Sequence, residues 1–336
     1  MKDGGTAMMD CGICVRPGQF RLEARPRPDE APEGWVLVDI AAVGICGTDY
    51  HIFEGKHPFL DYPRVMGHEL SGHVAIGPDA GRLVVVNPYL SCGTCRACLR
   101  GKPNCCRRIQ VLGVHRDGGL CGRIAVPAGN LYPADGLTVQ QAAMVEFLAI
   151  GAHAVARSGI GPGDLALVAG AGPIGLGTAL FARLAGAEVH LMDLSAKRLE
   201  LARSLCGFEN LHRPGDDILT GALAEGFDVV FDATGNLQAI EAGFPLVAHG
   251  GSTVLVSVVK GDIAFSDAEF HKRKSRIIGS RNALRADLDR VIQAMRQGEI
   301  PTDALVSGVV ALADLPERFP PLVHDRDDIV KILVTP

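Results

Sequence analysis

This sequence has few aromatic residues and only a small net charge. Phe, Trp and Tyr make up 5% of its 336 residues, and 33 basic residues are nearly matched by 38 acidic ones, which gives a net charge of −5. The most notable basic run is short, from His271 to Lys274. A nucleic-acid-binding surface needs clustered positive charge, so we expect no nucleic-acid partner. Glycine is instead abundant, at 41 residues, and suits close backbone approach to a ligand.

An uninterrupted long hydrophobic run is also missing. The most apolar window extends from residue 165 to 187, but it contains Pro173, several glycines and Arg183. A membrane-spanning helix needs about 20 mostly apolar residues in a row, so we expect no membrane partner. The opening residues, MKDGGTAMMDCGIC, lack the apolar core of a secretion signal. We therefore expect a cytoplasmic protein, in which clustered cysteines indicate metal or redox chemistry.

The pattern of expected secondary structure changes near residue 150. Before it, short β-like runs occur at 35–40, 83–86 and 124–126. After it, expected strands at 165–169, 188–192, 229–231, 253–259 and 276–279 alternate with helices at 174–185 and 196–205. Such alternation predicts a parallel sheet with helices on both faces. An amphipathic helix at 287–297 and a strand at 328–334 follow, and the sequence is thus predicted to be an α/β protein of two domains.

A glycine motif, Gly170-Ala-Gly172-Pro173-Ile174-Gly175, lies between the first strand and the first helix of this alternating part. In a dinucleotide-binding fold such glycines form the turn, let the backbone approach a pyrophosphate and let the helix pack on the strand. Asp193 ends the next strand and can accept hydrogen bonds from ribose hydroxyls, which favours NAD over NADP. Arg198 could weaken this preference, and a loop of an unrelated α/β protein is the alternative interpretation. The predicted coenzyme contacts are Gly170, Gly172, Pro173, Ile174, Gly175, Asp193, Arg198, Thr234 and Ser257.

A second group of candidate residues lies in the first part of the chain, within GICGTDYH at 44–51 and GHE at 67–69. These stretches contain Cys46, His68 and Glu69, and zinc prefers cysteine, histidine and carboxylate ligands. Taken singly, a buried cysteine or histidine is more often packed in a core. Their combination with a nucleotide-binding motif favours a metal site.

These motifs, in this order, resemble the medium-chain, zinc-dependent alcohol dehydrogenase superfamily, in the branch that contains sorbitol and threonine dehydrogenases. The resemblance rests on GICGTDYH, GHE, the cysteine cluster, VEFLAIGAHA around Glu146, GAGPIG and Asp193. It implies a GroES-like β-rich catalytic domain and a Rossmann coenzyme domain with a doubly wound parallel sheet. The expected boundaries are 1–150 for the catalytic domain, 151–285 for the coenzyme domain and 286–336 for a return segment that completes the catalytic domain.

The cysteine cluster resembles the structural zinc lobe of this family, at about residues 90–108. Cys92, Cys95, Cys98 and Cys106 have its spacing, and four thiolates close a tetrahedron around zinc. Cys105 is interpreted as a bystander, although it could replace its neighbour as a ligand. A redox dithiol is the competing hypothesis.

The resemblance also implies a catalytic zinc ion held by Cys46 and His68, with Glu69 as the expected third ligand. Glu146 is a further metal-site carboxylate, and the sequence does not rank the two. Zinc would act as a Lewis acid toward a substrate hydroxyl while hydride passes to NAD. Thr48 and His51 would form a proton relay, although a plain surface histidine is the alternative for His51.

Three stretches, at 113–119, 265–272 and 279–283, resemble the sugar-acid 5-dehydrogenases that act on L-galactonate or L-gulonate. A sugar acid carries a carboxylate, which arginine binds well. Arg281 is the first candidate for this role, and Arg116 and Lys272 are the second. The alternatives are a polyol or L-threonine dehydrogenase, or an NAD- and zinc-binding protein without turnover. A homo-oligomer, dimer or tetramer, is expected through the strand at 276–279.

Overall fold

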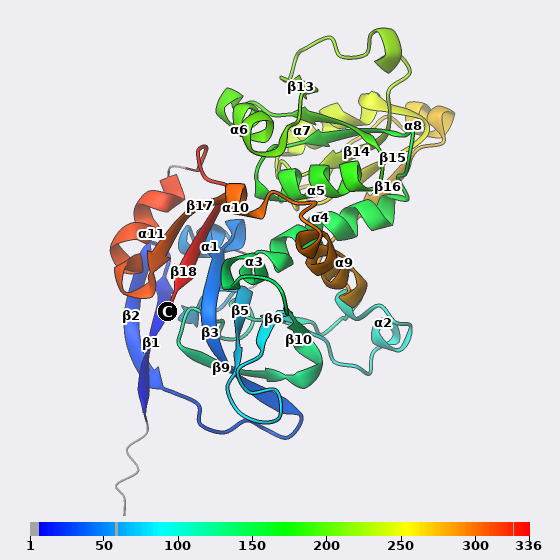
Figure 1. Ribbon diagram of the computed structural model, residues 1–336. Helices are drawn as coiled ribbons and strands as arrows, with labels where there is room; N and C mark the ends of the chain where they lie inside the picture. Colours follow the sequence, from blue (N-terminus) through cyan, green and yellow to red (C-terminus); the bar gives the residue numbers. More distant parts are fainter. Residues whose placement is uncertain (1–6, 58–59, 325) are drawn as a thin grey trace, which may run out of the picture. The chain divides into compact units, whose positions relative to one another are not determined.

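The structure is a computed structural model that describes residues 7–57, 60–324 and 326–336. The chain forms two compact units, which are best followed by colour in Figure 1. The first consists of Met1–Glu146 and Thr302–Pro336, and the second of Phe147–Pro301. The boundaries thus lie at 146 and 301 rather than at the expected 150 and 285.

The later boundary moves because helix α9 (Arg285–Arg296) packs within the second unit. Its Leu288, Val291 and Ile292 are buried, and its Asp287 carboxylate lies 2.7 Å from Nδ1 of His153 on α4 (Val145–Ser158). The amphipathic pattern therefore predicted the helix, but it did not predict the unit against which its apolar face packs.

The first unit is built on a seven-stranded sheet in which the central strand is β3 (Trp35–Ile45). The path order is β10-β6-β5-β3-β18-β17, with β9 also paired to β3; the bounds are β10 Leu131–Pro133, β6 Leu83–Val86, β5 Glu69–Val74, β18 Lys331–Thr335, β17 Val306–Ala311 and β9 Arg123–Pro127. A second sheet has the order β2-β1-β4, with β2 Gln19–Pro26, β1 Met8–Arg16 and β4 Arg64–Val65. The last strand, β18, pairs antiparallel with β3, so that Leu333 lies opposite Gly44. The C-terminal segment thus returns to the first unit, as expected.

Short helices complete the first unit. They are α1 (Gly47–Phe53), α2 (Arg96–Leu99), α3 (Val139–Ala143), α10 (Thr302–Leu305) and α11 (Leu315–His324). Helix α1 begins where β3 ends, and Cys46 is its N-cap residue. Cys46 therefore lies directly between the end of the strand and the start of the helix.

The second unit is a six-stranded parallel sheet with the order β13-β12-β11-β14-β15-β16. The strands are β13 Leu211–His212, β12 Glu188–Met192, β11 Leu165–Ala169, β14 Phe227–Asp232, β15 Val247–Leu255 and β16 Arg276–Gly279; the helices between them include α5 Pro173–Leu184, α6 Ala196–Cys206, α7 Leu237–Gly243 and α8 Asp267–Arg273. The order reverses between β11 and β14, which is where doubly wound sheets bind nucleotides. The oxygen of Ser195 accepts a hydrogen bond from the Arg198 amide and caps α6, as predicted.

One expected strand, at 253–259, is displaced. Strand β15 ends at Leu255, and the next two amides, of Val256 and Ser257, donate to the carbonyl of Asp232 in a loop. The apolar run continues to Val259, but Val258 is 90% exposed because no strand among the described residues pairs with this extension. Within the described residues, no helix combines the length and apolar character needed to cross a membrane.

Candidate active site and metal centres

Asp49 organises the start of α1 in the first unit. Its side chain is fully buried, and its carboxylate accepts hydrogen bonds from the amide of Cys46 at 2.9 Å and from the amide of Gly67 at 3.4 Å. One carboxylate therefore joins the Cys46 turn to the segment that carries His68 and Glu69. This contact agrees with the prediction that Asp49 orients ligands rather than reacting.

Cys46, His68 and Glu69 lie together as a candidate metal centre. One ligand atom from each lies within 4.8 Å of the others. Within the described part of the chain, the buried Nδ1 of His68 has no hydrogen-bond partner. Burial alone would lower the pKa of His68, but the negative charges of Cys46 and Asp49 raise it well above its ordinary value. The surroundings therefore favour a cation, and a thiolate, an imidazole and a carboxylate are a donor set that fits zinc.

The two carboxylates of this region have different partners. Glu69 is fully buried, and both of its oxygens lie 2.7 Å from Nζ of Lys331, which is 1% exposed. Lys331 also donates to the carbonyl of Ile45 at 3.2 Å. Glu146 is buried in the first turn of α4 and accepts a hydrogen bond from the hydroxyl of Tyr89. A cation thus holds Glu69, whereas a neutral hydroxyl holds Glu146.

Lys331 and Tyr89 were missed by the sequence reasoning. The signal for Lys331 was present, because a single lysine interrupts the apolar strand at 328–334. A buried lysine needs a charged or polar partner. Its partner could not be named, since Glu69 lies 262 positions earlier in the chain.

Thr48 and His51 both lie on α1. The hydroxyl of Thr48 lies 3.9 Å from Sγ of Cys46, and His51 is exposed in the last turn of the helix. Residues three apart are neighbours on a helix surface. The pair therefore leads from the thiolate to solvent, which is the direction that a proton relay requires.

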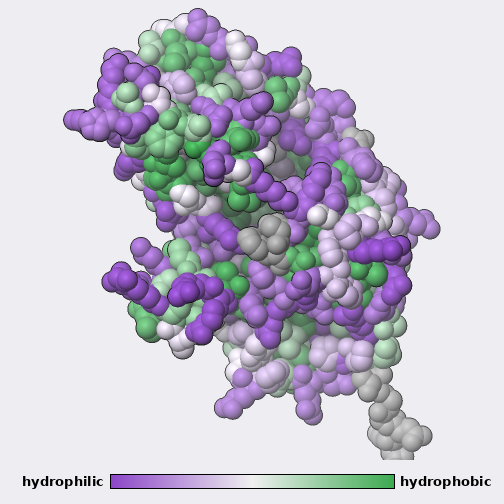
Figure 2. Space-filling model, turned by 180° about the vertical axis from the view of Figure 1, so that it is seen from behind, coloured by the Kyte–Doolittle hydropathy of each residue, from purple (hydrophilic) through white to green (hydrophobic). Residues whose placement is uncertain are grey.

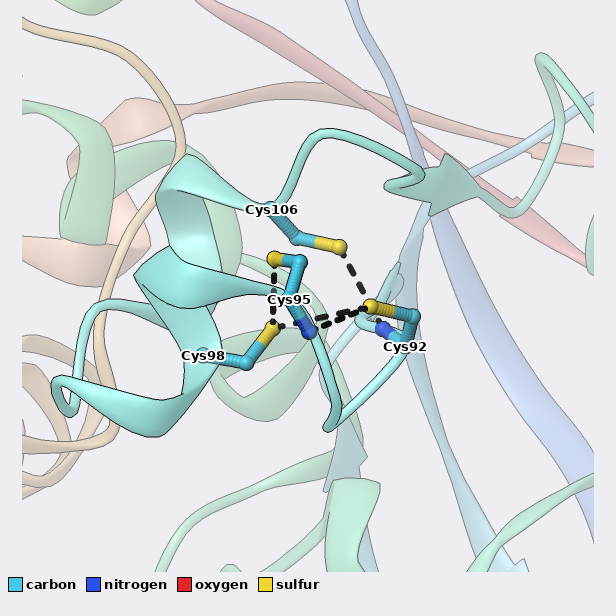
Figure 3. A group of neighbouring side chains, drawn as sticks. All are labelled: Cys92, Cys95, Cys98 and Cys106. Atoms are coloured by element: carbon cyan, nitrogen blue, oxygen red, sulfur yellow. Dashed lines mark hydrogen bonds between the residues drawn. The ribbon is translucent and has the colours of Figure 1, made fainter.

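The cysteine cluster forms a second candidate metal centre. Ligand atoms of Cys92, Cys95, Cys98 and Cys106 all lie within 4.8 Å of one another, and their side chains converge (Figure 3). The sulfurs of Cys95 and Cys98 are 3.5 Å apart, and all four cysteines are free thiols. The neighbouring Arg108 side chain and backbone amides lower the pKa of Cys92 to about 5. Thiolates arranged in this way suit a closed tetrahedral zinc site.

Cys105 is separate from this cluster. It is exposed at the end of a short 3-10 helix, Pro103–Cys105. The sulfur of its neighbour Cys106 instead accepts hydrogen bonds from the amides of Cys92 and Arg108, each at 3.3 Å. The fold therefore selects Cys106 for the group of four.

The glycine motif forms the turn between β11 and α5 in the second unit. Gly170 has a φ of +94°, a conformation that favours glycine. A Cβ atom on Gly175 would lie 1.6 Å from the carbonyl oxygen of Gly170, so the helix packs this closely only with glycine. The carboxylate of Asp193 accepts hydrogen bonds from the amides of Ala171 at 2.7 Å and Ser195 at 2.8 Å. This places an acid beside the open end of the turn.

Arg198 and two hydroxyl residues complete the predicted coenzyme group. A Cβ atom on Gly172 would lie 3.5 Å from Nη1 of Arg198, so this cation also borders the turn. Thr234 and Ser257 follow β14 and β15 and both hydrogen-bond to Asp232, which the sequence reasoning missed.

The three candidate substrate cations have different local surroundings. Arg281 is exposed just after β16. The guanidinium of Arg116 lies over the ring of Trp35, 5.5 Å from its centre, and Lys272 pairs with Glu269 on the surface of α8 at 3.7 Å. Arg116 and Lys272 thus each already have a local partner for the cationic group.

Comparisons with known proteins agree with these features. The family model described as "Alcohol dehydrogenase GroES-like domain" matches residues 32–136, and that described as "Zinc-binding dehydrogenase" matches residues 173–297. The L-galactonate-5-dehydrogenase of Escherichia coli K12 is 39% identical over 340 residues, covering 97% of this chain and 99% of that protein.

Solved structures of dehydrogenases are also similar to this chain. An alcohol dehydrogenase (rspB) of Escherichia coli CFT073, complexed with NADH, has a TM-score of 0.91 at 28% identity, covering 98% of this chain and 99% of that chain. A zinc-binding dehydrogenase of Sinorhizobium meliloti 1021, bound to NADP, has a TM-score of 0.89 at 29% identity, covering 98% and 100%. The GroES-like and Rossmann fold class predicted from the sequence is thereby confirmed.

Proposed function

Because this chain belongs to the zinc-binding, medium-chain alcohol dehydrogenase family, we propose that it oxidises a secondary hydroxyl of a sugar acid to the keto acid with NAD. The observation that carries the chemistry is the buried donor set of Cys46, His68 and Glu69. The identity of 39% with a sugar-acid dehydrogenase over nearly the whole chain supports the substrate class.

Cys46 and His68 would hold the catalytic zinc, with Glu69 or Glu146 as the third protein ligand. Bound zinc supplies a Lewis acid for the substrate oxygen, and bound NAD supplies the hydride acceptor. Lys331 balances the charge of Glu69 within this buried site. Cys92, Cys95, Cys98 and Cys106 would hold a second, structural zinc.

The chain's own hydroxyl and imidazole groups would remove the proton. Oγ1 of Thr48 would accept the proton of the substrate hydroxyl while the Thr48 hydroxyl donates its own proton onward, and the exposed ring of His51 would pass a proton to water. An imidazole suits this step because its ordinary pKa lies near neutrality.

The second unit would bind the coenzyme at the carboxyl ends of its strands. The pyrophosphate would lie at the glycine turn and the N-terminus of α5, where free amides and the helix dipole favour anions. Asp193 would bind the adenosine ribose hydroxyls and repel a 2′-phosphate, which favours NAD. Arg198, Thr234 and Ser257 would line the remainder of the site.

Arg281 would bind the substrate carboxylate. We expect Arg281→Ala to raise the KM for a sugar acid far more than the KM for sorbitol, because only the acid needs the guanidinium. Lys272→Ala is the matched control, since Lys272 is already paired with Glu269. Equal effects of Arg281→Ala on both substrates would refute the carboxylate role.

The activity itself is tested by NADH formation from L-galactonate and NAD with purified, zinc-loaded protein. Cys46→Ser should abolish turnover while the coenzyme still binds, because it removes a metal ligand of the first unit. Full activity of Cys46→Ser would overturn the assignment of the metal site.

Self-association would use the edge of the second sheet. Within the described residues β16 pairs with β15 alone, and its Ile277 is 37% exposed. On the face drawn in Figure 2, hydrophobic areas lie between hydrophilic ones. We propose a homo-oligomer that covers this edge. We also propose a location in the cytoplasm, where reducing conditions keep the zinc-binding cysteines as thiols. Light scattering that shows a monomer would refute the oligomer.

A further inference from the structure

Asp232 ends β14 on the carboxyl side of the parallel sheet, next to the point where the strand order reverses. It is 2% exposed, and neither the metal centres nor the substrate proposal uses it. We propose that Asp232 is a positioning residue for the nicotinamide half of the coenzyme. This inference rests on the coenzyme site proposed above and is independent of the proposed substrate.

The Asp232 carboxylate joins two loops. It accepts hydrogen bonds from the hydroxyl of Ser257 at 2.7 Å and from the hydroxyl and amide of Thr234 at 2.9 and 3.2 Å. The Ser257 hydroxyl in turn accepts from the amide of Gly235 at 3.0 Å. The loop after β14 and the loop after β15 are therefore fixed to each other by one buried carboxylate.

The topology assigns these loops to the nicotinamide side. A doubly wound sheet binds a dinucleotide across its switch point, with one mononucleotide over each half. The glycine turn and Asp193 lie on the β11–β12 half, which leaves β14 and β15 for the other mononucleotide.

The same loop also forms the wall behind the glycine turn. A Cβ atom on Gly170 would lie 2.9 Å from the carbonyl carbon of Ala233 and 3.1 Å from the amide of Thr234. The backbone that Asp232 holds thus directly borders the turn at the switch point. A shift of this loop would move the surface on which the coenzyme lies, without changing Asp193.

Burial raises the pKa of the Asp232 carboxyl, and the bonds from Ser257 and Thr234 oppose that effect. An uncharged amide of the same shape has one fewer acceptor atom and cannot satisfy these donors. Asp232→Asn therefore loosens the two loops while it preserves the volume of the side chain. Hydrogen bonds to a charged acceptor are the stronger kind, so the effect is expected to be measurable.

Calorimetric titration of Asp232→Asn with NADH and with AMP tests the proposal. We expect NADH affinity to fall about ten-fold, equivalent to about 1.4 kcal/mol, and AMP affinity to stay unchanged. Asp228→Asn is the matched control, because Asp228 lies near the opposite end of β14 and also accepts a bond from a neighbouring backbone, the amide of Leu165 at 2.8 Å. It should change neither affinity.

Equal losses for NADH and AMP, or unchanged NADH affinity, would overturn the proposal. If Asp232→Asn does not fold, Asp232→Ser, which removes the carboxylate and leaves every predicted coenzyme contact in place, must show the same split. Asp193→Asn tests the proposed coenzyme site separately from Asp232, because this variant should bind AMP more weakly. If it does not, the proposed coenzyme site is wrong, and the failure is not one of Asp232 alone.

Discussion

Replacement of Lys331 by methionine is expected to destabilise the first unit severely. Lys331 is 1% exposed, and its ammonium group makes two 2.7 Å contacts with the fully buried Glu69. Burial alone would lower the pKa of Lys331, but the nearby Glu69 and Cys46 raise it above its ordinary value, so the lysine is charged. Removing one partner of a buried ion pair typically costs about 3–5 kcal/mol, because the other charge stays buried and unpaired.

Chemical denaturation of Lys331→Met, Glu69→Gln and the double variant measures this effect. The double variant should be less destabilised than the sum of the single variants, because it leaves no unpaired charge. Lys56→Met is the matched control: its ion pair with Glu54, at 3.3 Å, is largely exposed on the lysine side and should contribute at most about 1 kcal/mol. A Lys331→Met variant no less stable than Lys56→Met would refute the reasoning.

Two further predictions concern other parts of the chain. Cys106→Ser should lose one of two zinc ions per chain, whereas Cys105→Ser should keep both, as measured by metal analysis; loss from both variants or from neither would contradict the chosen ligand set. Burial and the adjacent His190, whose Nδ1 lies 2.8 Å from Nε2 of His212, lower the pKa of His212 below its ordinary value of 6.5. The unfolded chain then binds protons more readily, so stability is full above about pH 6.5 and is lost as the pH falls from there toward the lowered folded value. His212→Asn should reduce this acid sensitivity in denaturation curves; an unchanged slope would refute the assignment.

Local sequence signals predicted much of the fold. The glycine motif and the cysteine cluster each occupy a short stretch, so the sequence indicates where both lie, although only the fold separates Cys106 from its neighbour Cys105. The strands and helices of the second unit follow the apolar period. The displaced end of β15 shows the limit, because Val258 continues an apolar run without a strand to pair with.

Long-range partners were the part that the sequence did not reveal. Tyr89 reaches Glu146 across 57 positions, and Lys331 reaches Glu69 only because β18 pairs with β3. A residue's burial can be estimated from local pattern, but the identity of its partner depends on the packing of distant elements. The supporting residues of the site were therefore missed, although its direct ligands were proposed from the sequence.

The ratio of kcat/KM for sugar acids to kcat/KM for neutral polyols tests the sugar-acid assignment most directly. The assay follows NADH formation by zinc-loaded protein with L-galactonate, L-gulonate, sorbitol and L-threonine. A high value is expected for one of the sugar acids and low values for sorbitol and L-threonine. Turnover mainly of sorbitol or L-threonine would contradict the sugar-acid assignment, and no turnover of any of the four would contradict the proposed activity.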